Sequence, residues 1–405
     1  MAPRTDFKET PWYKRIYFKK LGSLLGSLRS SQTEEKEEII ASTTSTPTLQ
    51  SLFDMLPDDP LKEIARWLPD QPPPPEKSFL SYFLSSQKNQ SPVSALMCSA
   101  KRFHLLLQPD SVANNFRYCV VYGNQKKAEA LLVAYPHLLS LLLQQKGQVI
   151  DYPGHTIYGT ALQIALGAED VKFHDNEECM AEMLLRYLRQ LPKGETIIDK
   201  QIAEQFPAGW REEENARIER DLVELKKVVA TLENAPDMDN CADDIKAFQN
   251  YLDDENKNRG VITKGKHFNM QLLIDALTLF VKKFDLLGGR WDSPKNILFW
   301  RKIIGYIERY IPTCYAQALC QGVPFIVMEG KKLTRRLTFA GHPDVSYYPR
   351  ENDPTICMGE DYSDYPRTVF AAAMMSFVVL SQTKATNVEE IMQSAPIIRQ
   401  RIGMS

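Results

Sequence analysis

The sequence predicts a mainly helical protein with a few short strands near its C-terminal end. Apolar side chains recur at the α-helical period over long stretches, for example along residues 216–232. Helix starts are marked where Asp59 precedes Pro60 and where Ser91 precedes Pro92, because a capping side chain followed by proline suits the first helical turn. Alternating apolar residues, typical of strands, occur in short runs at 324–328 and 336–339.

Length and composition are those of an ordinary globular protein. The 405 residues are enough for two or three domains with cores of their own, and 43% of them are apolar and 25% charged. The net charge of −2 provides no chain-wide attraction for nucleic acid, so we expect no nucleic-acid partner. The seven cysteines are scattered singly and no Cys-x-x-Cys pair exists, which predicts neither a disulfide scaffold nor a zinc finger.

Residues 1–30 are predicted to form a basic amphipathic helix, and residues 31–50, rich in Ser, Thr and Glu, a flexible linker. A basic amphipathic helix can lie on an anionic membrane surface, and it can equally pack against its own protein. Both interpretations stay open. In the first, the candidate membrane contacts are Trp12, Tyr13, Lys14, Arg15, Lys19 and Lys20.

Residues 51–110 contain the most specific pattern in the chain. A Leu-Pro pair at 56–57 precedes a short amphipathic helix, and a later helix carries Ser-Ala-Lys-Arg-Phe at 99–103. This combination resembles the F-box, a three-helix module that docks the Skp-family adaptor of cullin-RING ubiquitin ligases. The resemblance implies a helix-in-groove contact with that adaptor. The residues it assigns to the contact are Leu56, Pro57, Leu61, Ile64, Leu68 and Lys101.

The F-box resemblance has two departures. Ala100 differs from the usual signature of the later helix. The proline run 72–75 and the stretch 79–90 are inserted between the two helices, and successive prolines favour an extended polyproline conformation. Whether this insertion permits adaptor docking stays open. The alternative that these residues form an ordinary pair of core helices, which happens to begin with Leu-Pro, also stays open.

Residues 111–200 resemble divergent ankyrin repeats. The run Thr160–Ala165 is similar to the Thr-Pro-Leu-His opening of an ankyrin helix, and residues 181–185 end in Leu-Leu as the second helix of a repeat does. An earlier copy runs from 118 to 139. The extra residues 140–158 and 169–179 are expected in loops. Two repeats are too few for a stable solenoid, so neighbouring helices must cover them.

Residues 201–405 are expected to form a helical C-terminal domain with short strands. The order of an F-box, ankyrin-like repeats and a helical region resembles effectors that intracellular bacteria secrete into eukaryotic cells. The resemblance implies a substrate adaptor in the host cytosol, peripheral at membranes if the N-terminal helix binds them. Its partners would be a Skp-family adaptor and a host target protein that the sequence does not identify.

Neither a catalytic site nor a metal or cofactor site is indicated by any local pattern. The stretch Gly260–Lys266 has the spacing of a phosphate-binding P-loop, but His267 stands where that loop needs Ser or Thr, so we expect a plain loop before a helix. Two alternatives to the adaptor remain. One is a binding effector that sequesters a host protein without ubiquitin, and the other is an enzyme with a cryptic site near His342 and Cys357.

Overall fold

A computed structural model describes residues 101–348, except 176, 208–209, 236–240, 291 and 341, together with residues 370–395. All of these residues belong to one compact unit, Phe53–Ser405. Helices account for 66% of the interpretable residues, and the strands are few and short. The predicted mainly helical fold is therefore confirmed.

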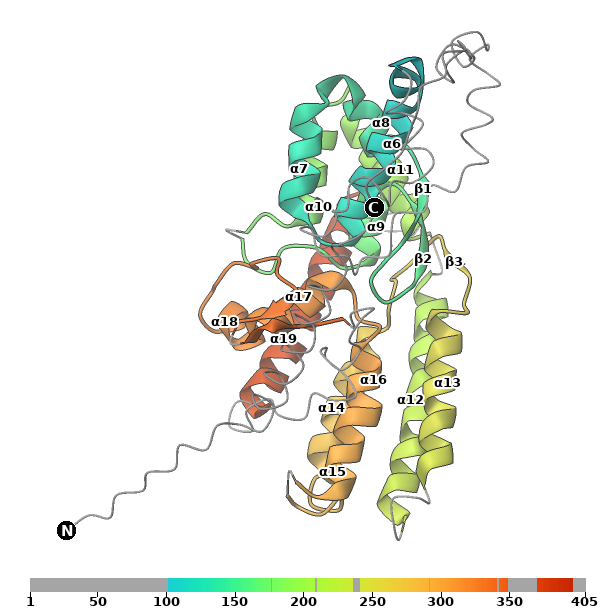
Figure 1. Cartoon of the computed structure of the whole chain (residues 1–405), viewed down its shortest axis with the longest axis vertical. Coiled ribbons are helices and arrows are strands. Elements are labelled where there is room, and N and C mark those ends of the chain that lie inside the picture. The colour runs from blue at the N-terminus through green and yellow to red at the C-terminus, as the bar shows by residue number, and fades with distance from the viewer. Residues whose placement is uncertain are drawn as a thin grey trace, which may run out of the picture. The chain divides into compact units, whose positions relative to one another are not determined.

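The first part of the described chain is a group of helices with two strands of a small sheet along one side (Figure 1). Its elements are α6 (Lys101–Val121), α7 (Gln125–Ala134), a 3-10 turn η1 (Pro136–Leu138), α8 (Leu139–Gln144), β1 (Gly147–Ile150), β2 (Thr156–Gly159), α9 (Ala161–Gly167), α10 (Met180–Leu188) and α11 (Gly194–Gln205). The start of α9 is set by Thr160, whose hydroxyl accepts from the Gln163 amide while the Gln163 side chain accepts from the Thr160 amide. This reciprocal capping box satisfies two amides that a helix start leaves free.

The second part consists of long and short helices and three short strands. It contains α12 (Trp210–Asn234), α13 (Ala242–Asn256), β3 (Val261–Ile262), α14 (Met270–Lys283), α15 (Pro294–Leu298), a π-helical segment η3 (Phe299–Ile304), α16 (Gly305–Glu308), α17 (Thr313–Gln321), α18 (Val323–Val327), β4 (Thr338–Phe339), β5 (His342–Ser346) and α19 (Phe370–Ser394). Helices α12 and α13 lie side by side (Figure 1). Helix α12 packs against α14, and α13 packs against η3.

The largest sheet joins distant parts of the sequence. Strand β2 pairs with β1 in antiparallel fashion and with β3 in parallel fashion, so that Thr156 lies opposite Val261. Val149, Ile157 and Ile262 point from this sheet into the protein and are almost fully buried. The loop between β1 and β2 is tied to α13 through His155, whose ring contacts Asp151 at 2.8 Å and Asn256 at 3.2 Å.

Two hydrophobic cores hold these elements together. The N-terminal core is made by side chains between residues 112 and 210 together with Ile262, and the C-terminal core by side chains between residues 225 and 348. Helix α19 joins them, because Phe377 and Leu380 belong to the C-terminal core whereas Val388 and Met392 belong to the N-terminal one.

Two local predictions were wrong. The apolar run at 324–328 is not a strand, because Val323–Val327 forms helix α18. Gly322, at φ 93°, ends α17, and Pro324 occupies the first turn of α18, where its fixed φ and missing N–H are tolerated. The stretch 140–158 is not a loop throughout, since it contains most of α8, all of β1 and the start of β2. The strand predicted at 336–339 is present in its second half as β4.

Candidate functional site

Most of the residues that the sequence assigns to function lie outside the described part of the chain. This holds for the adaptor contacts between Leu56 and Leu68, for the membrane contacts between Trp12 and Lys20, and for Cys357. Lys101 is the first residue of α6, and His342 the first of β5, but their side chains also lie outside the description. The described surface and its cavities are therefore the places to search for further sites.

The described cysteines are poorly suited to nucleophilic catalysis. Cys119, Cys179, Cys241, Cys314 and Cys320 are all buried and unbridged. Burial raises the pKa of Cys119 to about 11 and that of Cys314 to about 12, because a thiolate loses its hydration inside the protein. The Cys314 thiol donates to the Ala168 carbonyl at 3.3 Å. At neutral pH these thiols are protonated, whereas the thiolate is the reactive form.

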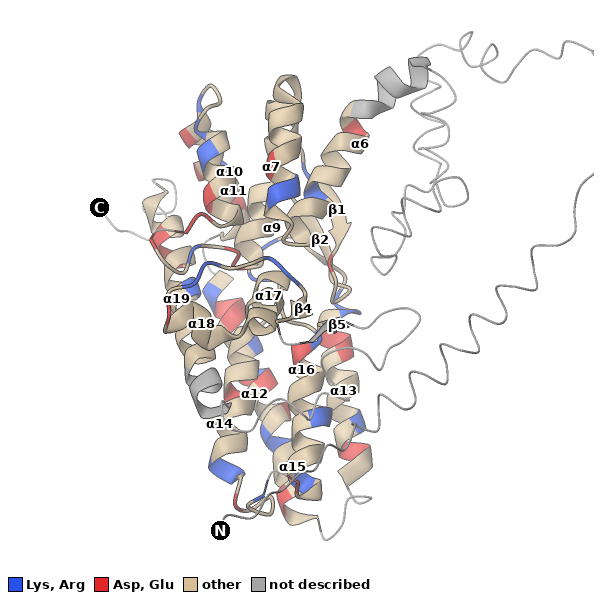
Figure 2. Ribbon diagram, turned by 60° about the vertical axis from the view of Figure 1, so that its left-hand side comes forward, with Lys and Arg blue, Asp and Glu red and all other residues tan. Residues whose placement is uncertain are grey.

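A buried polar layer connects the two cores. It consists of Glu169, Asp170, Lys266, Arg335 and Lys384, and Figure 2 shows acidic and basic segments meeting between α10 on one side and α17 and α18 on the other. Lys266 contacts the Glu169 carboxylate at 2.7 Å, and Arg335 contacts Asp170 at 2.6 Å. Lys384, on α19, donates to the Val171 carbonyl at 2.7 Å.

The backbone of this layer is strained at two points. Glu169, at φ 55°, and Arg335, at φ 61°, adopt the left-handed conformation that non-glycine residues seldom take. Each carries a charged side chain with partners from distant elements: Tyr315 donates to Glu169 at 2.8 Å, and Arg335 donates to Gln125 at 3.0 Å. Because these charges are paired with one another or with backbone carbonyl groups, we assign them to holding the two cores together rather than to chemistry.

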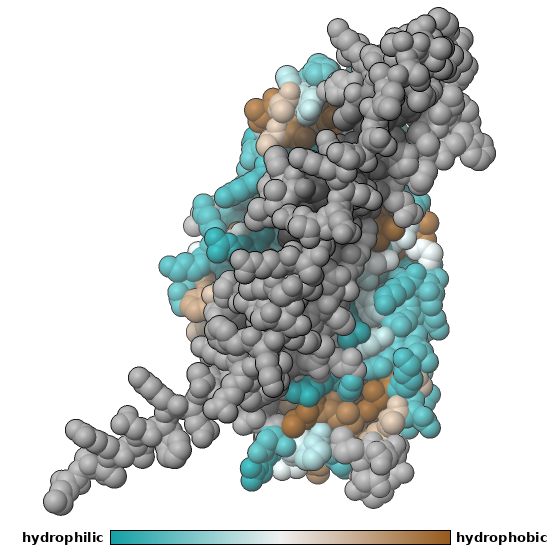
Figure 3. All heavy atoms as spheres, viewed as in Figure 1, coloured by the Kyte–Doolittle hydropathy of each residue, from teal (hydrophilic) through white to brown (hydrophobic). Residues whose placement is uncertain are grey.

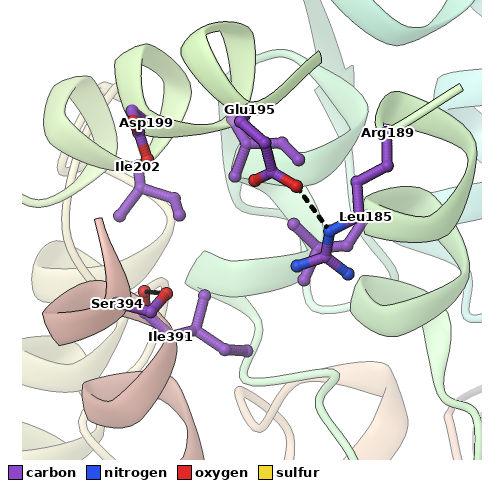
Figure 4. A pocket seen from close by; sticks show the side chains of 8 residues that line it. Leu185, Arg189, Glu195, Asp199, Ile202, Ile391 and Ser394 are labelled. Carbon is purple, nitrogen blue, oxygen red and sulfur yellow. Dashed lines mark hydrogen bonds and ion pairs between the residues drawn. The ribbon is translucent and has the colours of Figure 1, made fainter. Parts of the chain in front are cut away.

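One pocket lies between α10, α11 and α19 (Figure 4). We call it the interhelical pocket; it has a volume of about 270 Å³, and its apolar lining includes Leu185, Ile202 and Ile391. An ion pair between Arg189 and Glu195, at 2.9 Å, lies at its edge. Such a pocket can accept an apolar side chain of another molecule.

Polar groups also face the interhelical pocket. Asp199 extends from α11 and Ser394 from α19 (Figure 4). The pKa of Asp199 is raised, first by partial burial and then by the neighbouring Glu195. The arrangement places a carboxyl beside an apolar lining.

A second pocket, which we call the loop pocket, lies between α12 and the segment that follows α13. Its volume is also about 270 Å³. The lining residues are Trp210, Glu213, Glu214, Arg217, Arg220, Glu255, Arg259 and residues 261–266. The P-loop-like stretch of the sequence therefore forms one wall of a pocket. Sequence reasoning missed this site, because the spacing from Trp210 to Arg220 is helical but does not reveal which distant loop faces it.

The outer face of the three-stranded sheet exposes apolar side chains. Residues that pair across strands point to the same side, so Ile150, Tyr158 and Val261 share the face opposite the buried Val149 and Ile157. Their exposed fractions are 44%, 42% and 49%. In the view of Figure 3 the described surface is mostly hydrophilic, with hydrophobic areas separated from one another. We call the side chains of Ile150, Tyr158 and Val261 the exposed sheet face.

Comparisons with known proteins identify no relative of this chain. No protein-family model matches it, and no curated protein and no solved structure is significantly similar to it. Within the described residues no helix combines the length and apolar character needed to span a membrane, and no cluster of His, Cys, Asp and Glu side chains is arranged to hold a metal ion.

Proposed function

We propose that this chain is a substrate adaptor that recruits a target protein to a host cullin-RING (SCF-type) ubiquitin ligase. The F-box resemblance of residues 51–110 supports the ligase-binding half of the proposal, with contacts at Leu56, Pro57, Leu61, Ile64, Leu68 and Lys101. In this proposal the protein works in the cytosol of a host cell after secretion by a bacterium. It performs no bond chemistry of its own and raises the concentration of the target beside the ubiquitin-transfer machinery.

The order of elements between β1 and α10 supports the second half of the proposal. A β-hairpin, a helix capped by Thr160 and a further helix follow one another, which is the order within an ankyrin repeat. Helix α9 packs against β2, α10 and α11, and α6 and α8 also contact it. Such covering is what an isolated repeat needs for stability.

The exposed sheet face is the observation on which the target-binding role rests. Side chains as large as Ile, Tyr and Val are usually buried, and single exposed ones are ordinary, but here three lie on one face of adjacent strands, grouped around Thr156. Tyr158 also provides a hydroxyl, and tyrosine is enriched in protein interfaces because one end is apolar and the other polar. We therefore assign target binding to this face.

The ligase-binding half is tested by pulling down a Skp-family adaptor with the full-length chain. We expect binding by the unmodified protein and its loss in a Leu56→Ala/Pro57→Ala double variant, because those side chains would fill the apolar groove of the adaptor. Circular dichroism of both proteins checks that helix content is unchanged. If the unmodified chain does not bind the adaptor, the adaptor proposal is wrong and the sequestering effector becomes the leading function.

The target-binding half is tested with an Ile150→Ser/Tyr158→Ser double variant in the same host cells. Proteins captured by the unmodified chain and by the Leu56→Ala/Pro57→Ala variant, but not by the sheet variant, are the expected targets, and their ubiquitination should fall in both variants. The matched control is Val133→Ser/Val223→Ser, which removes two apolar side chains exposed elsewhere. Equal capture by the sheet variant and this control would show that the target binds another surface.

A further inference from the structure

The loop pocket gathers basic side chains from three separate segments. Arg217 and Arg220 come from α12, Arg259 follows α13, and Lys264 and Lys266 come from the loop before α14. Three lining carboxylates, Glu213, Glu214 and Glu255, come from α12 and α13. The lining thus carries five basic groups and three acidic ones, so the pocket has a positive balance.

Each acidic side chain is already engaged with one basic group. Glu213 contacts Lys264 at 2.8 Å and Glu214 contacts Arg217 at 3.1 Å. Glu255 lies 4.0 Å from Arg220, and Lys266 pairs with Glu169 in the polar layer.

Arg259 is the basic lining residue that none of these ion pairs includes. Among the described residues it has no ion pair within 4.0 Å and no hydrogen-bonded acceptor for its guanidinium. Its pKa is lowered, first by desolvation and then by the repulsion of Arg217. A bound anion would relieve that repulsion.

Arg217 provides an independent indication of a ligand. Only 7% of this residue is exposed, and its Nε lacks a hydrogen-bond acceptor although its Nη2 donates to Glu214. A buried guanidinium N–H without an acceptor is costly, because it has lost water and gained nothing in return. Since Arg217 also lines the pocket, an anion bound there could reach its guanidinium group.

We propose that the loop pocket binds the phosphate group of a phosphorylated ligand. Arginine guanidinium groups bind phosphate through paired, charge-assisted hydrogen bonds, and Arg217 and Arg259 bring such donors to the lining from separate segments. The volume of about 270 Å³ is slightly below the range of pockets for drug-sized ligands, which fits a compact phosphomonoester better than a whole nucleotide. The group could belong to a small soluble molecule or to a lipid headgroup.

Binding can be measured through Trp210, which lines the pocket. We expect sodium phosphate and glycerol 3-phosphate, added to the full-length protein at constant ionic strength, to change tryptophan fluorescence in a saturable manner. Sodium chloride and glycerol should not do so. A Trp210→Phe variant should lose the response, which separates it from the other four tryptophans of the chain.

The basic residues are tested by substitution. Arg259→Gln should weaken phosphate binding about tenfold or more, as expected when a charged hydrogen-bond donor is lost. Because the Arg259 side chain makes no ion pair with the described residues, this variant should fold even if the buried Arg217→Gln variant does not. Lys246→Gln removes one positive charge from an exposed position on α13 away from the pocket and should bind phosphate normally.

Vesicles distinguish the two sources of phosphate. The phosphate belongs to a lipid headgroup if the protein sediments with phosphatidylcholine vesicles that contain phosphatidic acid but not with charge-matched phosphatidylserine vesicles. Arg259→Gln should then abolish this sedimentation. Binding of glycerol 3-phosphate without such sedimentation would assign a soluble ligand. The proposal is overturned if phosphate and chloride act alike on Trp210, or if Arg259→Gln and Lys246→Gln bind phosphate equally well.

Discussion

The two cores of the molecule are packed in different ways. Three aromatic residues, Phe116, Phe206 and Trp210, are buried in the N-terminal core, against eleven in the C-terminal core. Most other members of the N-terminal core are Leu, Ile, Val and Ala. In the C-terminal core, aromatic rings contact one another, as Phe280 and Phe299 do with centroids 5.3 Å apart.

The two regions also differ in the proposed binding surface that each of them forms. The N-terminal region contributes two strands of the exposed sheet face, which is where we place target binding. The C-terminal region contributes most of α12 and the loop that form the loop pocket. Because α19 and the polar layer tie the two cores together, we expect them to unfold as one cooperative unit.

Removing one charge from the polar layer should have the largest effect on the stability of this cooperative unit. Asp170→Ala leaves the Arg335 guanidinium without its carboxylate, and removing one partner of a buried ion pair costs about 3–5 kcal/mol. We expect the free energy of unfolding in urea to fall by that amount. An Asp170→Ala/Arg335→Met double variant should be less destabilised than Asp170→Ala alone, because no unpaired charge remains. If the double variant loses as much as the sum of the two single variants, the two charges do not act as a pair.

Two buried groups should give the stability of the protein opposite dependences on pH. Burial raises the pKa of Glu308 in the C-terminal region to about 8, so the folded state binds a proton more tightly than the unfolded chain. Its contribution to stability is complete below the ordinary glutamate pKa and is lost as the pH rises toward 8. Burial lowers the pKa of His267 to about 3, so stability should instead fall as the pH drops below the ordinary histidine value.

Two variants separate the alkaline decline in stability from the acid one. Glu308→Gln should flatten the decline between pH 5 and 8, which for one proton is at most about 1.4 kcal/mol per pH unit. His267→Gln should flatten the decline on the acid side. Urea unfolding across the pH range measures both, and an unchanged alkaline limb in Glu308→Gln would show that this carboxyl does not titrate as its burial predicts.

The smallest of the three effects is expected at the point where the loop before α14 meets the N-terminal core. A Cβ added at Gly167 would lie 2.2 Å from Nε2 of His267, and both residues are buried. We expect Gly167→Ala to lower the free energy of unfolding by about 1–3 kcal/mol through overpacking. His267→Ala removes the obstructing ring, so the Gly167→Ala/His267→Ala variant should lose less than the sum of the single variants. Strict additivity would contradict the steric explanation.

Local patterns predicted several elements well. The amphipathic period along 216–232 predicted a helix that lies within α12, and the run beginning at Thr160 predicted a helix that is α9. Both signals are carried by neighbouring residues, namely a repeated apolar face and a capping side chain. The apolar run at 324–328 was misassigned because a short apolar segment suits a strand and a buried helical turn equally well.

The sequence by itself determined the helical class of this protein, because helix period and capping depend on residues three or four positions apart. Only the tertiary structure decided that Val261 lies opposite Thr156 on the neighbouring strand, and that Arg217 and Arg259 line the same pocket. These partners lie far apart in the chain, and no local propensity determines which distant segments meet. That choice follows from how α12, α13 and the sheet bury their apolar faces together, so the exposed sheet face and the loop pocket became visible only in the folded chain.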